Sequence, residues 1–464
     1  MPQVPCTQTL QRELADNIVR LAPLDDIRIL FACGAKANEP VTQGLRPLHY
    51  AVYRRYVEAV QLLLVRGCEV NARDEVGYTA IHLCAERGYD DLITLLLEHN
   101  GKVDFSARET DDPYPRTTLA EEPLRLAIKN GHYDTAKLLL ENGANPNARY
   151  FFGSEINLIN PLELRFVELL LTFGANPDAR DRSGLTPLMK ACRHPEGLQA
   201  ALLLIKNGAD INAMAGERHD FRSVLHYGVL SGNEKIVDLL LKQGARVIFP
   251  ADYRKPTPLD FAILRGNTIF VRTLIEAGSD VNAWSPLIGS PLHLACADNI
   301  QNRTEILTLL LDNGADPNLT TQTDTGPELK TPLGEYIAAN PNPEPEVIHL
   351  LLRYGAAVVL KSQYSDPRGI LKAFPRLSGE SQDIFSTLLA TAQAFNIGAI
   401  QRSSSLSSAR KDALLLQAQT PLSLKHQARL VLRRLLHPKG ILPSKVHELP
   451  LPALLKSYVL FEII

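Results

Sequence analysis

The stretch Leu138-Leu139-Leu140-Glu141-Asn142-Gly143-Ala144 decides the fold, because close copies of it recur along the chain. The leucines predict a helix that buries one face, and the glycine predicts the left-handed conformation that ends a helix without a Cβ clash. The glycine returns every 31 to 42 residues, which indicates a repeat architecture. The recurring glycines are Gly34, Gly67, Gly101, Gly143, Gly174, Gly208, Gly244, Gly278, Gly314 and Gly355.

A second mark recurs upstream of these glycines: a proline followed by leucine, usually behind Thr or Ser. A hydroxyl residue can cap a helix, and proline at the first helical position loses no hydrogen bond. Each unit is therefore predicted as a turn, a helix, a short loop and a second helix. The marks are Arg46-Pro47-Leu48-His49, Thr186-Pro187-Leu188-Met189, Thr257-Pro258-Leu259-Asp260, Ser290-Pro291-Leu292-His293 and Thr331-Pro332-Leu333.

On these two marks the chain resembles the ankyrin repeat family over residues 43–360. The resemblance implies an all-α fold, with about ten helix-turn-helix units stacked into a curved solenoid. Residues 1–42 are expected to form N-terminal capping helices and 361–398 a degenerate terminal repeat, since terminal repeats have one face in water. The longest gap predicts an enlarged finger loop over Phe105 to Glu121, and the shortest predicts a shortened first helix around Asn160-Pro161-Leu162.

In that family, partners usually bind the concave side, which is built from first helices and finger loops. The predicted fingers carry large side chains of the types favoured as interface anchors. The alternative is that several of them only cover the gaps between fingers. The candidate residues for binding a target protein are Arg73, Tyr78, Tyr114, Arg116, Tyr150, Phe151, Phe221 and Trp284.

The C-terminal part begins with a serine-rich stretch, and we expect residues 399–420 to be a linker. The pattern of residues 421–464 is then helical, and its apolar stripe consists of Leu424, Ala428, Val431, Leu432 and Leu435. Leu430 and Leu436 lie off this stripe, so the helix needs covering on more than one side. A module this small is expected to need a partner or the end of the repeat array. The alternatives are a capping helix, or a basic helix for calmodulin or a membrane.

The same segment resembles the SOCS box, and the resemblance implies a small module of three helices. Ser423, Leu424, Ala428 and Leu432 match its elongin-binding pattern, with Ala428 where cysteine is commonest. The resemblance implies that these four residues contact elongin C. Leu449-Pro450-Leu451-Pro452 matches the box that selects cullin-5, and Leu455, Lys456 and Tyr458 match the closing helix, with Leu455 and Tyr458 as expected core residues. The two boxes follow the ankyrin-like repeats in the chain, and this arrangement resembles the ankyrin repeat and SOCS box family.

This resemblance implies a non-catalytic adaptor of a ubiquitin ligase. Its expected partners are elongin C, elongin B, cullin-5 with its RING-box protein, and a protein substrate held by the repeats. The alternative is an ankyrin scaffold or inhibitor with a helical cap.

Hydrophobic residues are 45% and charged residues 22% of the chain, which is typical of a soluble globular protein. The net charge of -2 gives no reason to expect nucleic acid or an anionic membrane as a partner. No apolar run is long enough to span a bilayer, and no signal peptide is visible. We therefore expect a protein of the cytoplasm that can also enter the nucleus.

The sequence offers no catalytic, metal-binding or cofactor motif, so no enzyme activity, metal or cofactor is expected. The six cysteines are dispersed, and we expect reduced thiols. His49, His226 and His293 occupy the repeat's own histidine position, where a structural hydrogen bond is expected.

Overall fold

The structure is a computed structural model, and it divides into two compact units, Met1–His219 and Asp220–Ile464. It describes residues 7–105, 121–150, 152–250, 252–285, 288–320, 329–340, 342–362, 366–377, 382–436 and 442–462. Because the units are not placed relative to one another, each is described by itself.

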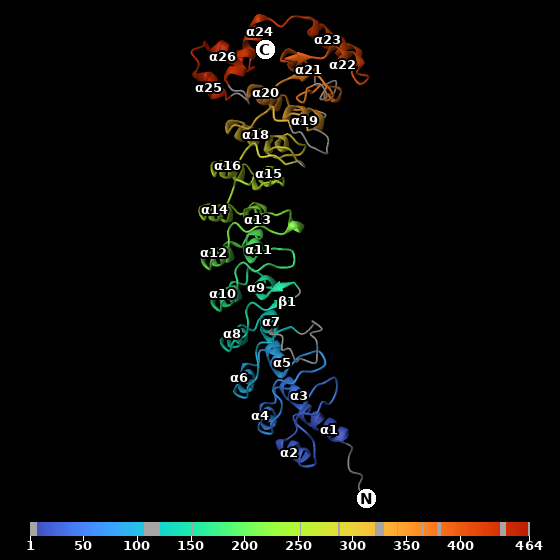
Figure 1. The fold of residues 1–464 in the computed structure, drawn as a ribbon, viewed down its shortest axis with the longest axis vertical. Coiled ribbons are helices and arrows are strands. Elements are labelled where there is room, and N and C mark those ends of the chain that lie inside the picture. The colour runs from blue at the N-terminus through green and yellow to red at the C-terminus, as the bar shows by residue number, and fades with distance from the viewer. Residues whose placement is uncertain are drawn as a thin grey trace. The chain divides into compact units, whose positions relative to one another are not determined.

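The first unit is built from pairs of consecutive helices, and a short loop joins the first helix of each pair to the second (Figure 1). The pairs are α1 (Thr7–Val19) and α2 (Leu24–Ala32), α3 (Pro47–Tyr53) and α4 (Val57–Val65), α5 (Ala80–Arg87) and α6 (Asp90–Glu98), α7 (Pro123–Lys129) and α8 (Tyr133–Glu141), α9 (Glu155–Leu158) and α10 (Leu164–Thr172), and α11 (Pro187–Arg193) and α12 (Leu198–Lys206). A short ladder joins β1 (Arg149–Tyr150) to β2 (Gly153–Ser154), and the 3-10 turn η1 (Glu217–His219) ends the unit.

The second unit continues with the same kind of pair. Its repeat helices are α13 (Val224–Ser231) and α14 (Glu234–Lys242), α15 (Pro258–Leu264) and α16 (Thr268–Glu276), α17 (Pro291–Ala295) and α18 (Arg303–Asp312), and α19 (Pro332–Ala339) and α20 (Pro345–Arg353). Beyond them lie β3 (Val359–Leu360), η2 (Phe374–Arg376), α21 (Gln382–Ala390), β4 (Ala394–Phe395), α22 (Ile397–Arg402), α23 (Ser408–Gln419), α24 (Leu424–Leu436), α25 (Pro443–Glu448) and α26 (Ala453–Val459). Strands β3 and β4 pair in parallel.

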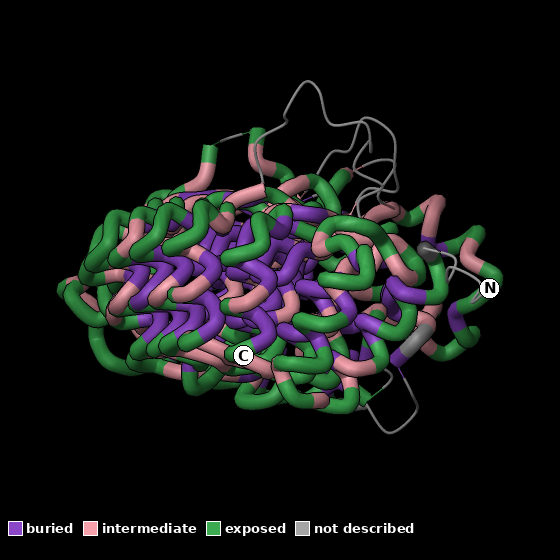
Figure 2. Tube along the Cα trace, turned by 90° about the horizontal axis from the view of Figure 1, so that it is seen from below, coloured by how far each residue is buried: buried purple, intermediate pink, exposed green. Residues whose placement is uncertain are grey.

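The core lies between the helices of each pair and between successive pairs. Each second helix buries the leucines of the recurring stretch, such as Leu139 and Leu140 in α8 and Leu310 and Leu311 in α18. Figure 2 shows the buried residues gathered inside the stacked turns, with exposed residues at the rims. Each Å² of apolar surface that is buried stabilises the folded chain by about 25 cal/mol. The stacking of the helix pairs is therefore the main stabilising contribution.

The two recurring marks do what the sequence predicts. The side chains of Thr186, Ser290 and Thr331 each accept a hydrogen bond from a backbone N–H in the first turn of their helix. Gly143 has φ 92° and ends α8 in the left-handed conformation. The exception is Gly101, whose neighbour Asn100 takes the positive φ of 64° instead. A Cβ at Gly101 would lie 2.8 Å from the Leu96 carbonyl oxygen, so close packing explains this glycine.

The recurring histidines tie one turn to the next. His226 Nδ1 accepts from the Ser223 N–H at 2.9 Å, and its Nε2 lies 3.0 Å from the Pro256 carbonyl oxygen. A ring nitrogen that accepts an N–H is unprotonated, so the neutral ring carries its proton on Nε2 and donates it to the carbonyl. His293 makes the same pair of contacts with Ser290 and Lys330. The predicted structural role of these histidines is confirmed.

These neutral histidines make stability sensitive to acid. Burial lowers the pKa of His226 to about 4, below the 6.5 of an unfolded histidine. Between these two pH values the unfolded chain binds a proton that the folded chain excludes, so folding weakens as the pH falls. We expect a loss of about 1.4 kcal/mol per pH unit for His226 within this window.

The measurement is urea unfolding at pH 7, 6 and 5 for the natural chain, His226→Gln and His447→Gln, the last being an exposed control. The His226→Gln chain should show the shallowest pH dependence, and equal slopes for all three would contradict the expectation. Only the difference between chains is informative, because burial raises the pKa of Asp260 to about 6 and of Glu155 to about 7. Those two groups shift stability in the opposite direction.

The fold class is confirmed: stacked helix pairs are followed by three C-terminal helices, α24 to α26. Two short strand pairs are additions that the sequence pattern did not predict. The first helix α9 is shortened to four residues, Glu155–Leu158, slightly before the place we expected. Most of the enlarged finger loop over Phe105 to Glu121 lies outside the described residues.

The range 399–420, predicted to be a linker, is mostly helical in the structure, through the end of α22 and the whole of α23. The serines act at helix boundaries, since Ser407 accepts a hydrogen bond from the Arg410 N–H at 3.4 Å. Arg410 Nη1 donates to the Leu377 carbonyl at 2.7 Å, and Leu414 is buried. These contacts fasten α23 to the preceding turn, so the stretch is part of the folded unit.

Candidate functional site

The candidate site is the three-helix module formed by α24, α25 and α26 at the end of the second unit (Figure 1). Helix α24 begins after Ser423, whose Oγ accepts from the His426 N–H at 3.2 Å. Ser423 therefore caps the helix, a structural role beside the contact role that the sequence predicts. Pro443 lies at the start of α25, and Pro452 immediately precedes α26.

One face of α24 presents apolar side chains to solvent. Leu424 is 84% exposed and Leu435 is 77% exposed, with Ala428 and Val431 exposed between them. Leu454 in α26 is also an exposed large apolar residue. Exposing leucine side chains costs free energy that burial would recover, roughly 1.5–3 kcal/mol for each one fully covered. A contiguous apolar stripe on a charged helix makes this face a candidate surface for another protein.

The opposite face of α24 is buried although it carries arginines. The guanidinium carbon of Arg429 lies 3.3 Å from the ring centroid of Tyr458 and 4.3 Å from that of Phe461. Arg433 lies 4.4 Å from the Phe461 centroid and donates to the Val459 carbonyl at 2.6 Å. Burial lowers the pKa of Arg433 to about 9 and of Arg429 to about 10, so both remain charged at neutral pH. Aromatic faces and carbonyls replace water around the two cations.

The arginine face also fastens the module to the last repeat. Arg433 Nη2 donates to the Leu352 carbonyl at the end of α20. Arg353, the next residue, pairs with Glu462 at 3.3 Å. The sequence predicts that the module needs a partner, or the end of the repeat array, to cover its apolar sides. In the structure, the end of the array covers one side of α24, and the apolar stripe on the other side is exposed to solvent.

The small core of the module differs from the expected one. It consists of Val446, Val459 and Leu460, against which Leu432, Leu436 and Leu449 pack. Tyr458 is buried as predicted, but Leu455 is 39% exposed, so its assignment to the core is wrong. Leu432 is half-buried and turns toward this core, so it is a less accessible contact residue than Leu424 or Ala428. Val431 and Leu435 complete the exposed stripe in its place.

The predicted cullin-binding segment lies between α25 and α26. Pro450 and Pro452 are exposed, whereas Leu449 and Leu451 are half-buried. The two prolines remove backbone donors, and the Leu451 N–H donates to the Leu449 carbonyl at 2.7 Å, so the connection bends at Pro450. The four residues thus offer two accessible proline rings on a stretch that Leu449 fastens to the core of the module.

In the first unit, the finger candidates Arg73 and Tyr78 meet at one place. The guanidinium of Arg73 lies 5.4 Å from the Phe105 ring, and Tyr78 stacks on His82 at 5.3 Å. Both side chains are half-buried, so they partly serve to cover the turn. Tyr150 is half-buried with its hydroxyl inside the protein. Tyr114, Arg116 and Phe151 lie outside the described residues.

In the second unit, the candidates Phe221 and Trp284 belong to different turns. Phe221 is 44% exposed and has a positive φ of 54°, which places it at a tight turn. Trp284 is half-buried, with Arg254 5.5 Å from its ring centroid. Phe249, Tyr253 and Asp260 line the same hollow as Trp284, and the sequence pattern does not predict them as site residues. The available signal is Asp260 itself, which stands where other repeats have histidine.

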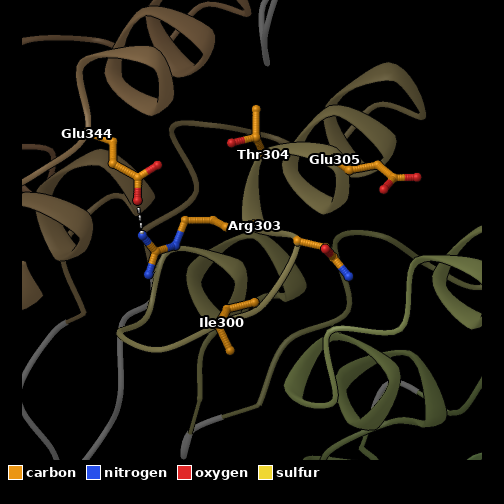
Figure 3. Close-up of a pocket in the computed structure, with 6 residues that line it drawn as sticks. Ile300, Arg303, Thr304, Glu305 and Glu344 are labelled. Atoms are coloured by element: carbon orange, nitrogen blue, oxygen red, sulfur yellow. Dashed lines mark hydrogen bonds and ion pairs between the residues drawn. The ribbon is translucent and has the colours of Figure 1, made fainter.

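A hollow of about 300 Å³ lies at the start of α18, lined by Ile300, Asn302, Arg303, Thr304, Glu305 and Glu344 (Figure 3). Arg303 pairs with Glu344 at 3.2 Å and donates to the Ala297 carbonyl at 3.0 Å. These contacts use the arginine to hold the loop before α18, which is a structural role.

The cysteines in the described residues are unpaired thiols, and all but Cys33 are buried. Burial raises the pKa of Cys68 to about 11 and of Cys192 and Cys296 to about 12. Such thiols stay protonated, and a protonated thiol is a poor nucleophile. In the parts of the chain that the structure describes, no helix is long and apolar enough to cross a bilayer, and no cluster of metal-ligating side chains occurs.

Residues 420–460 match the SOCS box family, and 22–109 and 48–150 match ankyrin repeats in three copies. Single ankyrin repeats match at 183–215, 257–285 and 290–322. Ankyrin repeat and SOCS box protein 16 of Homo sapiens is 32% identical over 366 residues, which cover 75% of each chain. The chain belongs to the ankyrin repeat and SOCS box family.

This member of the ankyrin repeat and SOCS box family is also 32% identical over 371 residues to ankyrin repeat and SOCS box protein 16 of Mus musculus, covering 75% of each chain. Among solved structures, the ankyrin repeat domain of human ASB11 is 22% identical with a TM-score of 0.39. That match covers 50% of this chain and 98% of the other.

Proposed function

We propose that this chain is the substrate-recognition subunit of a ubiquitin ligase built on elongin B, elongin C and cullin-5 with its RING-box protein. Family membership and the SOCS box support this role. The observation that carries it is the exposed stripe of Leu424, Ala428, Val431 and Leu435 on a helix whose other face is already covered. Apolar side chains in this arrangement fit a groove of a partner.

In this proposal the chain itself carries out no chemistry. The repeats hold a target protein, and the module brings the ligase to it. The contribution to rate is proximity, because a lysine of the bound target is kept at high effective concentration near a charged conjugating enzyme.

The experiment is stepwise assembly followed by size-exclusion chromatography. The full chain is mixed first with elongins B and C, then with cullin-5 and its RING-box protein. We expect co-elution at both steps. A chain that elutes alone at the first step would overturn the proposal and favour a scaffold with a helical cap.

A Pro450→Ala, Pro452→Ala double variant separates the two steps. Both rings are exposed, so the change should leave the module folded. We expect elongins B and C to remain bound while affinity for cullin-5 falls about tenfold or more, since a preorganised apolar contact is lost. Equal cullin-5 binding by the variant and the natural chain would remove this segment from the interface.

A further inference from the structure

A second hollow, of about 140 Å³, lies between two successive turns of the second unit. Its lining includes Phe249, Tyr253, Lys255, Asp260, Asp280 and Trp284. We call it the Asp260 pocket. Its volume is on the scale of one long side chain, and it combines aromatic rings with carboxylates.

The pocket exists because one turn departs from the repeat pattern. Asp260 stands where His226 and His293 stand in the turns before and after it. Those histidines reach the next turn, at 3.0 Å from the Pro256 carbonyl and 2.8 Å from the Lys330 carbonyl. Aspartate is shorter and has no donor when ionised, so it cannot make this contact.

Only one of the two carboxylate oxygens of Asp260 accepts hydrogen bonds. Its Oδ2 accepts from the Thr257 N–H at 2.7 Å and from the Thr257 hydroxyl at 2.9 Å. Its Oδ1 is buried without a hydrogen-bond partner, and the residue is only 3% exposed. A buried acceptor without a partner costs about 1–3 kcal/mol, more when charged. Burial accordingly raises the pKa of Asp260 to about 6.

Three aromatic rings line the same hollow as Asp260. Phe249 and Tyr253 stack with their ring centroids 4.5 Å apart. Trp284 lines the same hollow, and its Nε1 is also buried without a partner. The faces of such rings attract a cation, and a planar guanidinium can also stack on them.

The cations near the pocket each have a partner already, and for Arg254 that partner is a ring of the pocket lining. Lys255 Nζ lies 3.4 Å from Asp220, and Arg222 lies 3.7 Å from the same carboxylate. Arg254 lies over Trp284, at 5.5 Å from the ring centroid. Asp280 adds a second carboxylate to the lining, with its Oδ1 accepting from the Asn282 N–H. Asp260 itself forms none of the ion pairs found among the described residues.

We propose that the Asp260 pocket binds an arginine side chain of the protein held by the repeats. The guanidinium would donate to Oδ1 of Asp260 and stack against the aromatic rings. This inference deepens the proposed function, because it names the chemistry of one target contact. It is tested without elongins or cullin-5, so failure of one idea leaves the other untouched.

Trp284 is the single tryptophan of the chain, and its fluorescence therefore reports on this pocket directly. The full chain is titrated with Nα-acetyl-arginine amide, with the neutral isostere Nα-acetyl-citrulline amide, and with Nα-acetyl-lysine amide. We expect a saturable change with the arginine probe and at least about tenfold weaker binding of the citrulline probe, since charge-assisted bonds are the strong ones. The lysine probe should lie between them.

Two variants carry the same test into the protein. Asp260→Asn keeps the shape and removes the charge, so binding of the arginine probe should weaken about tenfold or more. Asp260→His installs the residue of the neighbouring turns, should unfold at a similar temperature, and should abolish the response. Equal binding of arginine and citrulline probes, or an undiminished response in Asp260→His, would overturn the proposal. If Asp260→Asn fails to fold, the two isosteric probes on the natural chain decide alone.

Discussion

Replacing Leu424 with aspartate is expected to abolish capture of elongins B and C by a chain that remains folded. Leu424 is 84% exposed, so the unbound protein loses no core contact. In the proposed complex the leucine is covered, and its loss together with burial of an unpaired carboxylate costs at least about 3 kcal/mol. Affinity should therefore fall by a hundredfold or more. Calorimetric titration with the elongin B–C complex measures this directly.

The matched control is Leu416→Asp, because Leu416 is an exposed leucine on the neighbouring helix α23, before the SOCS box segment. This variant should bind elongins B and C as the natural chain does. Thermal unfolding of both variants should match the natural chain. Undiminished binding of elongins B and C by Leu424→Asp would contradict the adaptor proposal.

Replacing Arg433 with alanine is expected to detach the C-terminal module from the last repeat. Arg433 is buried and donates to two carbonyls, those of Val459 and Leu352. Removing it leaves both acceptors without this donor in a buried site and removes the cation from the Phe461 ring. The Leu352 carbonyl keeps its bond from the Gly355 N–H at 3.0 Å, so the loss falls mainly on the Val459 carbonyl and the ring contact, about 2–4 kcal/mol in total. Lysine at this position should recover part of it, since it keeps the charge but lacks the planar fork.

Hydrogen exchange of the backbone in α24 and α26 measures this detachment, because local opening exposes these amides while the repeats stay protected. In Arg433→Ala both helices should exchange much faster, with α13 to α18 unchanged. Lys445→Ala is the control, since Lys445 is an exposed basic residue of the same module. Equal protection in Arg433→Ala and the control would show that Arg433 does not hold the module on the last repeat.

Much of the fold can be predicted from local chemistry. The leucine run, the glycine after it and the proline-leucine mark each specify a helix face, a helix end or a helix start. Where a residue acts through a distant neighbour, the prediction fails. Gly101 is explained by its approach to the Ile81 side chain, and the stretch around Ser407, whose composition predicts a linker, is fastened where Arg410 donates to the Leu377 carbonyl.

The candidate site shows the same division. Leu424 and Ala428 are exposed where the helical pattern puts them, and the pattern also includes Val431 and Leu435. Leu455 was assigned to the core but is exposed, because Val446, Val459 and Leu460 fill that space. Nothing in the composition of α24 says that its arginine face is the buried one.

The sequence by itself determined the repeat architecture, the three C-terminal helices and the family, because each repeat signals its own helix starts and ends within a few dozen residues. Only the tertiary structure decided which face of α24 is covered and where a cavity opens. Burial of Arg429 and Arg433 depends on Tyr458, Phe461 and the end of α20 meeting them in space. The hollow beside Asp260 likewise depends on the shape left between two turns when a histidine that would bridge them is absent.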